Sequence, residues 1–407
     1  MALDLSKVAP QIEGMAQRLA QSGEERDRSL KQALAVFDDQ SHHIDELRRK
    51  IDASTGKTTW LVAGIRDGLN RCYPVPPTPR DFTVMATDGS HIDVDRHRRA
   101  RCYLINTGAV TLTYGEHSGA ILDSYPRLYS SDEDMVIAPP EGTGGRVQPL
   151  EGYLLGIKRS VEECRKLVQL AGKLSGGSSA LALLDGSLIL WGLARRDIPE
   201  FVIEALLHQG YLSCMEELRT GSTGKNLAVA SYISFPRSTD VVNALRVALC
   251  PHDIPDCDRF CETLAPGKHP CDGIAGVQDR ELFSGLLGQG ERSDLFRSTS
   301  SIIRNRYGDE HRVSFFYLKL EDEIARIEVP EWVARDEKRL RLVHSLVYDQ
   351  CRRGQGYPVA LSEAHEQAVI TTADRENFWL VAESYLAHEK LPTTGSAKNF
   401  SKRTRWV

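Results

Sequence analysis

Two stretches of the sequence end an apolar, strand-like run on the same three residues, Asp-Gly-Ser. The first is MATDGSHID at residues 85–93 and the second is LALLDGSLI at residues 181–189. Asp-Gly is a common turn dipeptide, so one copy alone would indicate a turn. Two copies also fit adjacent strands that bring Asp88 and Asp185 to one edge of a sheet, where a divalent cation would neutralise both carboxylates. The pattern leaves two interpretations, a pair of turns or a metal site.

The two serines of these stretches, Ser90 and Ser187, raise the separate question of a covalent nucleophile. Neither lies in a G-x-S-x-G elbow, and a nucleophilic serine would also need a positioned base. We therefore expect both to support the turns by capping.

A second group of chemically capable residues consists of four cysteines within 22 residues, accompanied by two histidines in a segment rich in Pro and Asp. The cysteines are Cys250, Cys257, Cys261 and Cys271. Four soft ligands this close suggest zinc or an iron–sulfur cluster, although the C-x6-C-x3-C-x9-C spacing is not that of a standard zinc finger. The alternative is a segment that binds no metal. The remaining cysteines are expected to be small buried hydrophobic residues.

Basic residues gather in the segments FPRSTD and GERSDLFRSTSSIIRNRYG and in the C-terminal tail, residues 391–407. The arginines of the two segments are Arg237, Arg292, Arg297, Arg304 and Arg306. They are suited to contact the phosphates of DNA, and a solvated charged surface is the alternative. The tail contacts DNA or is a disordered end.

The hydrophobic pattern predicts the elements that must position these residues. Apolar residues at helical spacing over 4–51 indicate one or two amphipathic helices, which serve either ordinary packing or contact with a partner. Residues 82–129 predict a meander of three strands, 130–149 a mobile loop and 151–174 a helix that precedes the strand of Asp185. Further strands are expected near 226–235, 311–320 and 324–330, and helices over 336–354 and 362–389. The fold class is mixed α/β.

Composition restricts the class of protein. The 407 residues are 41% hydrophobic and 26% charged, values typical of a globular chain, and no segment has the roughly 20 apolar residues of a membrane span. The start of the chain has no secretory pattern, so we expect a cytoplasmic protein with reduced cysteines and no membrane contact. A net charge of −5 argues against a broadly basic nucleic-acid coat and leaves room for a local basic groove.

Several motifs in a fixed order resemble one family, the NurA nucleases. They are the Asp88-Gly89-Ser90 strand, the LLDGSL strand, the hairpin VSFFYLKL…IARIEVPEWV and the stretch GYPVALSEAHEQAVIT. The resemblance implies an RNase H-like mixed sheet core flanked by helices. It places a helical segment at 1–75, the nuclease domain at 76–390 with a cysteine-rich insertion at about 248–275, and a basic tail at 391–407.

The resemblance also implies a set of site residues. The acidic metal ligands correspond to Asp88, Asp185 and a Glu on the helix before the second Asp strand. That helix offers both Glu162 and Glu163, and Glu163 is preferred because Arg159 stands four residues before it. The late Tyr and His of the family correspond to two further residues, Tyr357 and His365. His365 would add a metal ligand or move a proton, and Tyr357 would orient a phosphate or the attacking water.

The implied activity is a deoxyribonuclease that requires Mn²⁺ or Mg²⁺. It would cut single-stranded DNA internally and degrade DNA from 5′ ends during end processing and repair, as a homodimer beside a HerA-type hexameric ATPase. The competing hypothesis is a catalytically weak adaptor that docks DNA ends or the ATPase. An adaptor has no need for two strand-end aspartates together with the late Tyr and His.

Overall fold

The structure is a computed structural model that describes residues 4–95, 100–142, 144–175, 177, 179–195, 197–265 and 267–390. The chain forms two compact units. Of the described residues, the first contains those within 4–75, 233–304 and 312–327, and the second contains those within 76–232, 305–311 and 328–390. The cysteine-rich segment thus packs with the N-terminal residues, and the domain limits drawn from the sequence remain a prediction. The basic tail and its predicted DNA contact lie outside the described residues.

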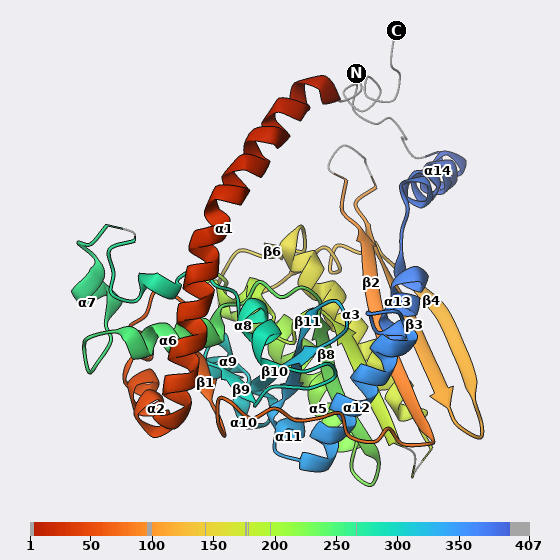
Figure 1. The fold of residues 1–407 in the computed structure, drawn as a ribbon. Coiled ribbons are helices and arrows are strands. Elements are labelled where there is room, and N and C mark those ends of the chain that lie inside the picture. Colours follow the sequence, from red (N-terminus) through yellow and green to blue (C-terminus); the bar gives the residue numbers. More distant parts are fainter. Residues whose placement is uncertain are drawn as a thin grey trace. The chain divides into compact units, whose positions relative to one another are not determined.

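The first unit is built from N-terminal helices and a small group of strands (Figure 1). The helices predicted over 4–51 are α1 (Leu5–His42) and α2 (Ile44–Ala53). The strands are β1 (Ala63–Ile65), β9 (Phe296–Ser298), β10 (Val313–Lys319) and the first part of β11 (Ile324–Pro330), hydrogen-bonded in the order β1-β9-β10-β11. Helices α6 (Asp240–Leu249), α7 (Cys257–Cys261), α8 (Asp279–Leu286) and α9 (Ser301–Arg306) complete it. Its core joins Phe37, Leu47, Leu245, Phe283 and Phe296.

The second unit holds the strands that carry both Asp-Gly-Ser stretches. Its order is β11-β8-β7-β2-β3-β4, with β8 at Asn226–Ile233, β7 at Ser179–Asp185, β2 at Phe82–Ile92, β3 at Tyr103–Tyr114 and β4 at Gly119–Tyr129. Strands β2, β3 and β4 are the predicted antiparallel meander, and β7 is parallel to both β2 and β8. An antiparallel meander followed by a helix and parallel strands is the arrangement expected of an RNase H-like core. The mixed α/β prediction is confirmed.

Helices cover both faces of the central strands in this unit. Val84, Met85 and Ala86 are successive residues of β2, and all three are fully buried, which requires covering on both sides because successive side chains alternate between faces. Helix α3 (Tyr153–Gly172) contacts β2, and α13 (Val359–Ala368) contacts β2 and β3, as Figure 1 shows. The two helices therefore supply the surroundings of the Asp88 strand.

The remaining helices of the second unit all follow β7 along the chain. They are the short η1 (Trp191–Ala194) and α4 (Glu200–Ile203), the π-helix η2 (Glu204–Leu212), α5 (Ser213–Gly221), α10 (Gly308–His311), α11 (Glu331–Ala334), α12 (Glu337–Arg353) and α14 (Thr372–His388). The predicted loop at 130–149 contains the short pair β5 (Val136–Ile137) and β6 (Gln148–Pro149). In the described part of the chain, no helix is both long and apolar enough to cross a membrane.

Candidate active site

The parallel pairing of β2 with β7 places the two aspartates side by side. The register pairs Thr87 with Leu184, so Asp88 and Asp185 are the next positions along the two strands. Neighbouring strands lie about 4.8 Å apart, which brings the two side chains to one level of the sheet. The structure thus unites the two residues that the sequence offered as a pair.

The two Asp-Gly-Ser stretches differ in backbone. Strand β2 continues past Asp88 to Ile92, whereas β7 ends at Asp185. Gly186 adopts a φ of 79°, a conformation that favours glycine, so the second stretch is a turn and the first is not. The interpretation of the first stretch as a strand-ending turn is wrong, because β2 stays paired with β3 from Asp88 through Ile92.

The serines hold neighbouring segments in place. Ser90 donates its hydroxyl hydrogen to the carbonyl of Ala368, at the end of α13. Ser187 donates to Oε2 of Glu328, which also accepts from the backbone N–H of Leu188. Both serines therefore have structural partners, Ser90 at the end of α13 and Ser187 at Glu328 of β11 and at the backbone N–H of Ile189, from which its oxygen accepts.

Helix α3 brings Glu163 over the strand at Gly89. The Thr87 hydroxyl donates to the Glu163 carbonyl at 3.1 Å, which fixes this part of the helix above β2. A Cβ atom at Gly89 would lie only 2.5 Å from Oε1 of Glu163 and 2.8 Å from Cγ of Arg159. The glycine is needed because the Glu163 carboxylate occupies the space of a side chain.

The surroundings of Glu163 disfavour its negative charge. The side chain is buried, and burial raises its pKa to about 7; the nearby charges of Asp88 and Asp185 add to the rise, while Arg159 opposes it. Nε of Arg159 lies 3.0 Å from Oε1, yet Oε1 accepts no hydrogen bond. Three carboxylates therefore act on one another at this point, with one arginine to balance them.

The neighbouring Glu162 has different partners. One of its oxygens lies 2.7 Å from Nζ of Lys158 and 2.7 Å from Nη1 of Arg165, and these cations lower its pKa against the opposing effect of burial. Successive residues on a helix point about 100° apart, so only one of the two can face the strands. Glu163 is the one that approaches Asp88 and Asp185.

Helix α13 supplies the histidine from the opposite side of β2. Gly108 of β3 pairs with Asp88, and a Cβ there would lie 2.1 Å from the carbonyl oxygen of Ala364, so the helix rests directly on the strand. His365 follows Ala364, and its Nδ1 lies 2.7 Å from Oδ2 of Asp88. A carboxylate can only accept, so Nδ1 carries the proton and Nε2 has the free lone pair in the neutral ring.

Tyr357 precedes α13 and serves Asp185. It lies near enough to Asp185 to lower the pKa of that carboxyl, and its ring packs edge-on against Tyr232 with the centroids 5.3 Å apart. Desolvation raises the pKa of Asp185 despite its partly exposed side chain, Tyr357 lowers it, and the charge of Asp88 raises it. Burial and the two aspartates raise the pKa of Tyr357, so it remains a hydrogen-bond donor at neutral pH.

The donor set fits a hard divalent cation. Among the residues that the structure describes, no three His, Cys, Asp or Glu side chains are arranged to hold an ion as they stand. The chemistry nevertheless matches, because the buried Oε1 of Glu163 lacks a hydrogen-bond partner and acts on two further carboxylates. Asp88, Glu163 and Asp185 would supply oxygen ligands, and His365 would supply nitrogen.

The raised pKa of Glu163 gives a prediction for the ion-free protein. The folded state binds this proton with a pKa of about 7, against an ordinary glutamate pKa of 4.5, so the stability that it contributes is complete below pH 4.5 and is lost as pH rises through 7. The difference corresponds to roughly 3 kcal/mol. In chelator, Glu163→Gln should flatten this fall in urea-unfolding free energy between pH 5 and 8. An unchanged pH slope would contradict the shifted titration.

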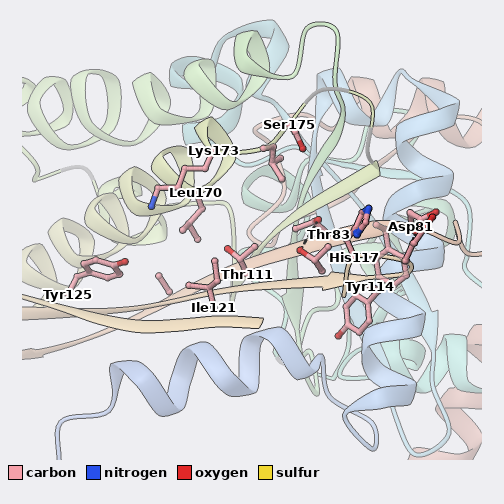
Figure 2. A pocket seen from close by; sticks show the side chains of 15 residues that line it. Asp81, Thr83, Thr111, Tyr114, His117, Ile121, Tyr125, Leu170, Lys173 and Ser175 are labelled. Carbon is pink, nitrogen blue, oxygen red and sulfur yellow. Dashed lines mark hydrogen bonds between the residues drawn. The ribbon is translucent and has the colours of Figure 1, made fainter. Parts of the chain in front are cut away.

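A cavity of about 410 Å³ in the same unit is separate from these residues. It is lined by residues of β2, β3, β4 and the C-terminal end of α3, among them Thr83, Thr111 and Leu170 (Figure 2). Thr83 precedes Asp88 by five residues, or about 17 Å along a strand. None of the five proposed site residues is among its lining residues.

The other candidate residues occupy varied places. Arg237, Arg297 and Arg304 are exposed, while Arg306 is half-buried and forms a two-bond ion pair with Glu200. Arg292 is buried, with its guanidinium 3.9 Å from the ring centre of Tyr73. Each of the four clustered cysteines is a half-buried free thiol of the first unit.

Sequence reasoning missed the two glycines that make room for the site. Gly89 admits the Glu163 carboxylate and Gly108 admits α13. The available signal was a glycine inside a strand pattern, which often marks a close approach of another segment. Gly108 stands in such a pattern, INTGAVTLTY.

Two solved structures are similar to parts of this chain. Among solved structures, the NurA nuclease from Sulfolobus solfataricus is 14% identical, with 78% of this chain and 88% of that chain covered and a TM-score of 0.45. LC9-RNase H1, a type 1 RNase H with the type 2 active-site motif, is 7% identical, with 42% and 71% covered and a TM-score of 0.22. No curated protein matches the chain.

The match to a family model shows which family the chain belongs to. Residues 82–370 match the model of the NurA domain, which is more than half of the chain and includes every residue from Asp88 to His365 discussed above. The match confirms the resemblance drawn from the sequence motifs. The chain therefore belongs to the NurA family.

Proposed function

We propose that this protein is a divalent-metal-dependent DNA nuclease whose active site consists of Asp88, Glu163, Asp185, Tyr357 and His365. The observation that carries the proposal is the convergence of three carboxylates, in which Asp88 and Asp185 both raise the pKa of the buried Glu163. Such mutual repulsion destabilises a protein unless a cation is bound there. Membership of the NurA family supports the same activity.

Each residue has a distinct role in phosphodiester hydrolysis. When bound, divalent cations activate the attacking water and neutralise charge on the phosphate. Asp88, Glu163 and Asp185 would hold these cations in place. The His365 side chain is 62% exposed, so it can exchange a proton with solvent while Asp88 fixes its orientation. Tyr357 would help to orient the Asp185 carboxylate, on whose pKa it acts.

The finer features of the proposal rest on the family. We propose Mn²⁺ as the working ion, with Mg²⁺ as the alternative, and both internal cutting of single strands and 5′–3′ digestion in DNA end processing and repair. The protein would act as a homodimer beside a HerA-type hexameric ATPase. A cytoplasmic location agrees with its nine cysteines, all of which are free thiols.

For the DNA contact we retain two of the exposed arginines. Arg237 and Arg304 are exposed and suited to phosphate oxygens. Arg306 would have to leave Glu200, and Arg292 is buried against aromatic rings. Charge reversal at Arg237 or Arg304 would weaken DNA binding with a smaller salt dependence, which a salt titration measures.

A direct assay tests the proposal. The full chain is incubated with end-labelled single- and double-stranded DNA in Mn²⁺, Mg²⁺ or chelator, with Asp185→Asn as the matched inactive protein and RNA as a second substrate. We expect cleavage in metal, none in chelator and none by the variant. Failure to cut any substrate in any metal would favour the adaptor hypothesis instead.

The space above Gly89 gives a second prediction for activity. Gly89→Ala would push the Glu163 carboxylate and the Arg159 stem aside, because its methyl would lie 2.5 Å from Oε1 and 2.8 Å from Cγ. A displacement of about 1 Å in a catalytic group costs roughly a hundredfold in rate. We expect a loss of that size in the cleavage rate of Gly89→Ala.

The matched control for this change is Gly156→Ala on α3, the helix that carries Glu163. A Cβ at Gly156 meets nothing within 4 Å, and alanine favours the helix, so this variant should keep its activity and its stability. Equal activity of the two variants would mean that the position of Glu163 does not matter for cleavage.

A further inference from the structure

The segment between α6 and α8 has almost no hydrophobic support of its own. Of its described residues from 250 to 273, only Pro255 is buried, and the apolar side chains of Ile254 and Leu264 are exposed. Its regular structure is limited to the five-residue helix α7 and the start of a short 3-10 turn at Asp272–Ile274. A loop of this length without a core is commonly held by some other link.

The four cysteines are the side chains that such a link would connect. Cys250 directly follows α6, Cys257 and Cys261 begin and end α7, and Cys271 precedes the 3-10 turn. All four are half-buried, in contrast to the exposed Cys72 of the same unit. Together they span the segment from one end to the other.

Their thiols lie close enough to affect one another. Burial raises the pKa of Cys257, and charges at Cys271 and Cys250 raise it further. The same holds for Cys261, where Cys257, Cys271 and Cys250 all contribute after burial. These mutual effects place the four thiols in one neighbourhood of the first unit.

Cationic groups from neighbouring helices hold the two ends of the segment. Arg246 donates from Nη2 to Sγ of Cys271 at 3.6 Å and from Nε to its carbonyl at 3.3 Å. Lys50 of α2 donates to the carbonyl of Cys250. Hydrogen bonds to sulfur and to the adjacent backbone are the usual support of thiolate-bound metals.

We infer that Cys250, Cys257, Cys261 and Cys271 bind a thiolate-ligated metal centre, a zinc ion or an iron–sulfur cluster, that holds the segment 250–273 to the first unit. This site is distinct from the carboxylates of the second unit and would be structural. As noted above, no such group is in ligating position among the described residues, so binding must draw the sulfurs together. The segment can follow because so little of it is buried, and metal binding then contributes folding energy.

The test is the metal content of the full chain purified without oxygen. We expect either about one equivalent of zinc, or iron with matching sulfide and a visible chromophore. Cys257→Ser and Cys271→Ser should each lose the metal, and Cys72→Ser should keep it. Whether the protein contains zinc or iron distinguishes the two kinds of centre, and either metal supports the site.

Two further measurements separate loss of metal from loss of folding and from the other metal site. Removal of the metal by a strong chelator should lower the melting temperature of the wild type by several degrees and leave Cys257→Ser unchanged. Asp185→Asn should retain the metal. No zinc or iron after purification and after reconstitution with either would overturn the inference, as would metal that is lost from Asp185→Asn instead of Cys257→Ser.

Discussion

Asp88→Asn and Asp185→Asn should each reduce DNA cleavage by on the order of a thousandfold or more, which corresponds to about 4 kcal/mol of barrier. An amide keeps the size of the side chain and removes the charge that attracts a hard cation. The two residues lie at one level of neighbouring parallel strands, so the loss of either should impair the same site. The measurement is the single-turnover rate in Mn²⁺ with end-labelled DNA.

Folding should survive both substitutions. Oδ1 of Asp88 accepts from the backbone N–H of Gly89 at 2.7 Å, and the amide oxygen of Asn can accept the same bond. Because each change removes one of several repelling carboxylates, the melting temperature in chelator should stay level or rise. The stabilisation added by Mn²⁺ should shrink. If either variant cleaved DNA at the wild-type rate, these residues would have a purely structural role.

Glu163→Gln and Glu162→Gln form the second comparison, because the two residues are adjacent and differ in what they face. Glu163 acts on Asp88 and Asp185, whereas Glu162 is engaged by Lys158 and Arg165. We expect Glu163→Gln to lose on the order of a thousandfold in cleavage rate, or about 4 kcal/mol. Glu162→Gln should stay within about threefold of the wild type, or less than 1 kcal/mol.

Stability should change in the opposite order. Glu163→Gln removes a buried charge at pH 8 and should leave the ion-free protein as stable as the wild type or more so. Glu162→Gln replaces a carboxylate that pairs with two cations and should cost up to about 1 kcal/mol in urea unfolding. A larger loss of activity in Glu162→Gln would show that the wrong glutamate has been assigned.

Local sequence patterns predict much of the fold. The apolar runs that became β2 and β7, the helical periodicity of residues 153–172 and the meander at 82–129 depend on neighbours in the chain, and all were predicted. The residue types of the candidate site were also visible, because carboxylates that follow buried strands are unusual enough to draw notice. The helices at 200–221 were not predicted, since η2 is a π-helix with buried residues on several sides.

The tertiary structure alone decided which of these residues meet. The pairing of Thr87 with Leu184 is a contact between residues 97 positions apart, and a shift of one residue would have turned one aspartate to the other face. The choice between Glu162 and Glu163 depended on the rotation of α3 over Gly89. The sequence by itself determined the residue types, the elements and their order. Register, helix rotation and close packing at two glycines determined the site, because these depend on contacts between segments that are distant in the chain.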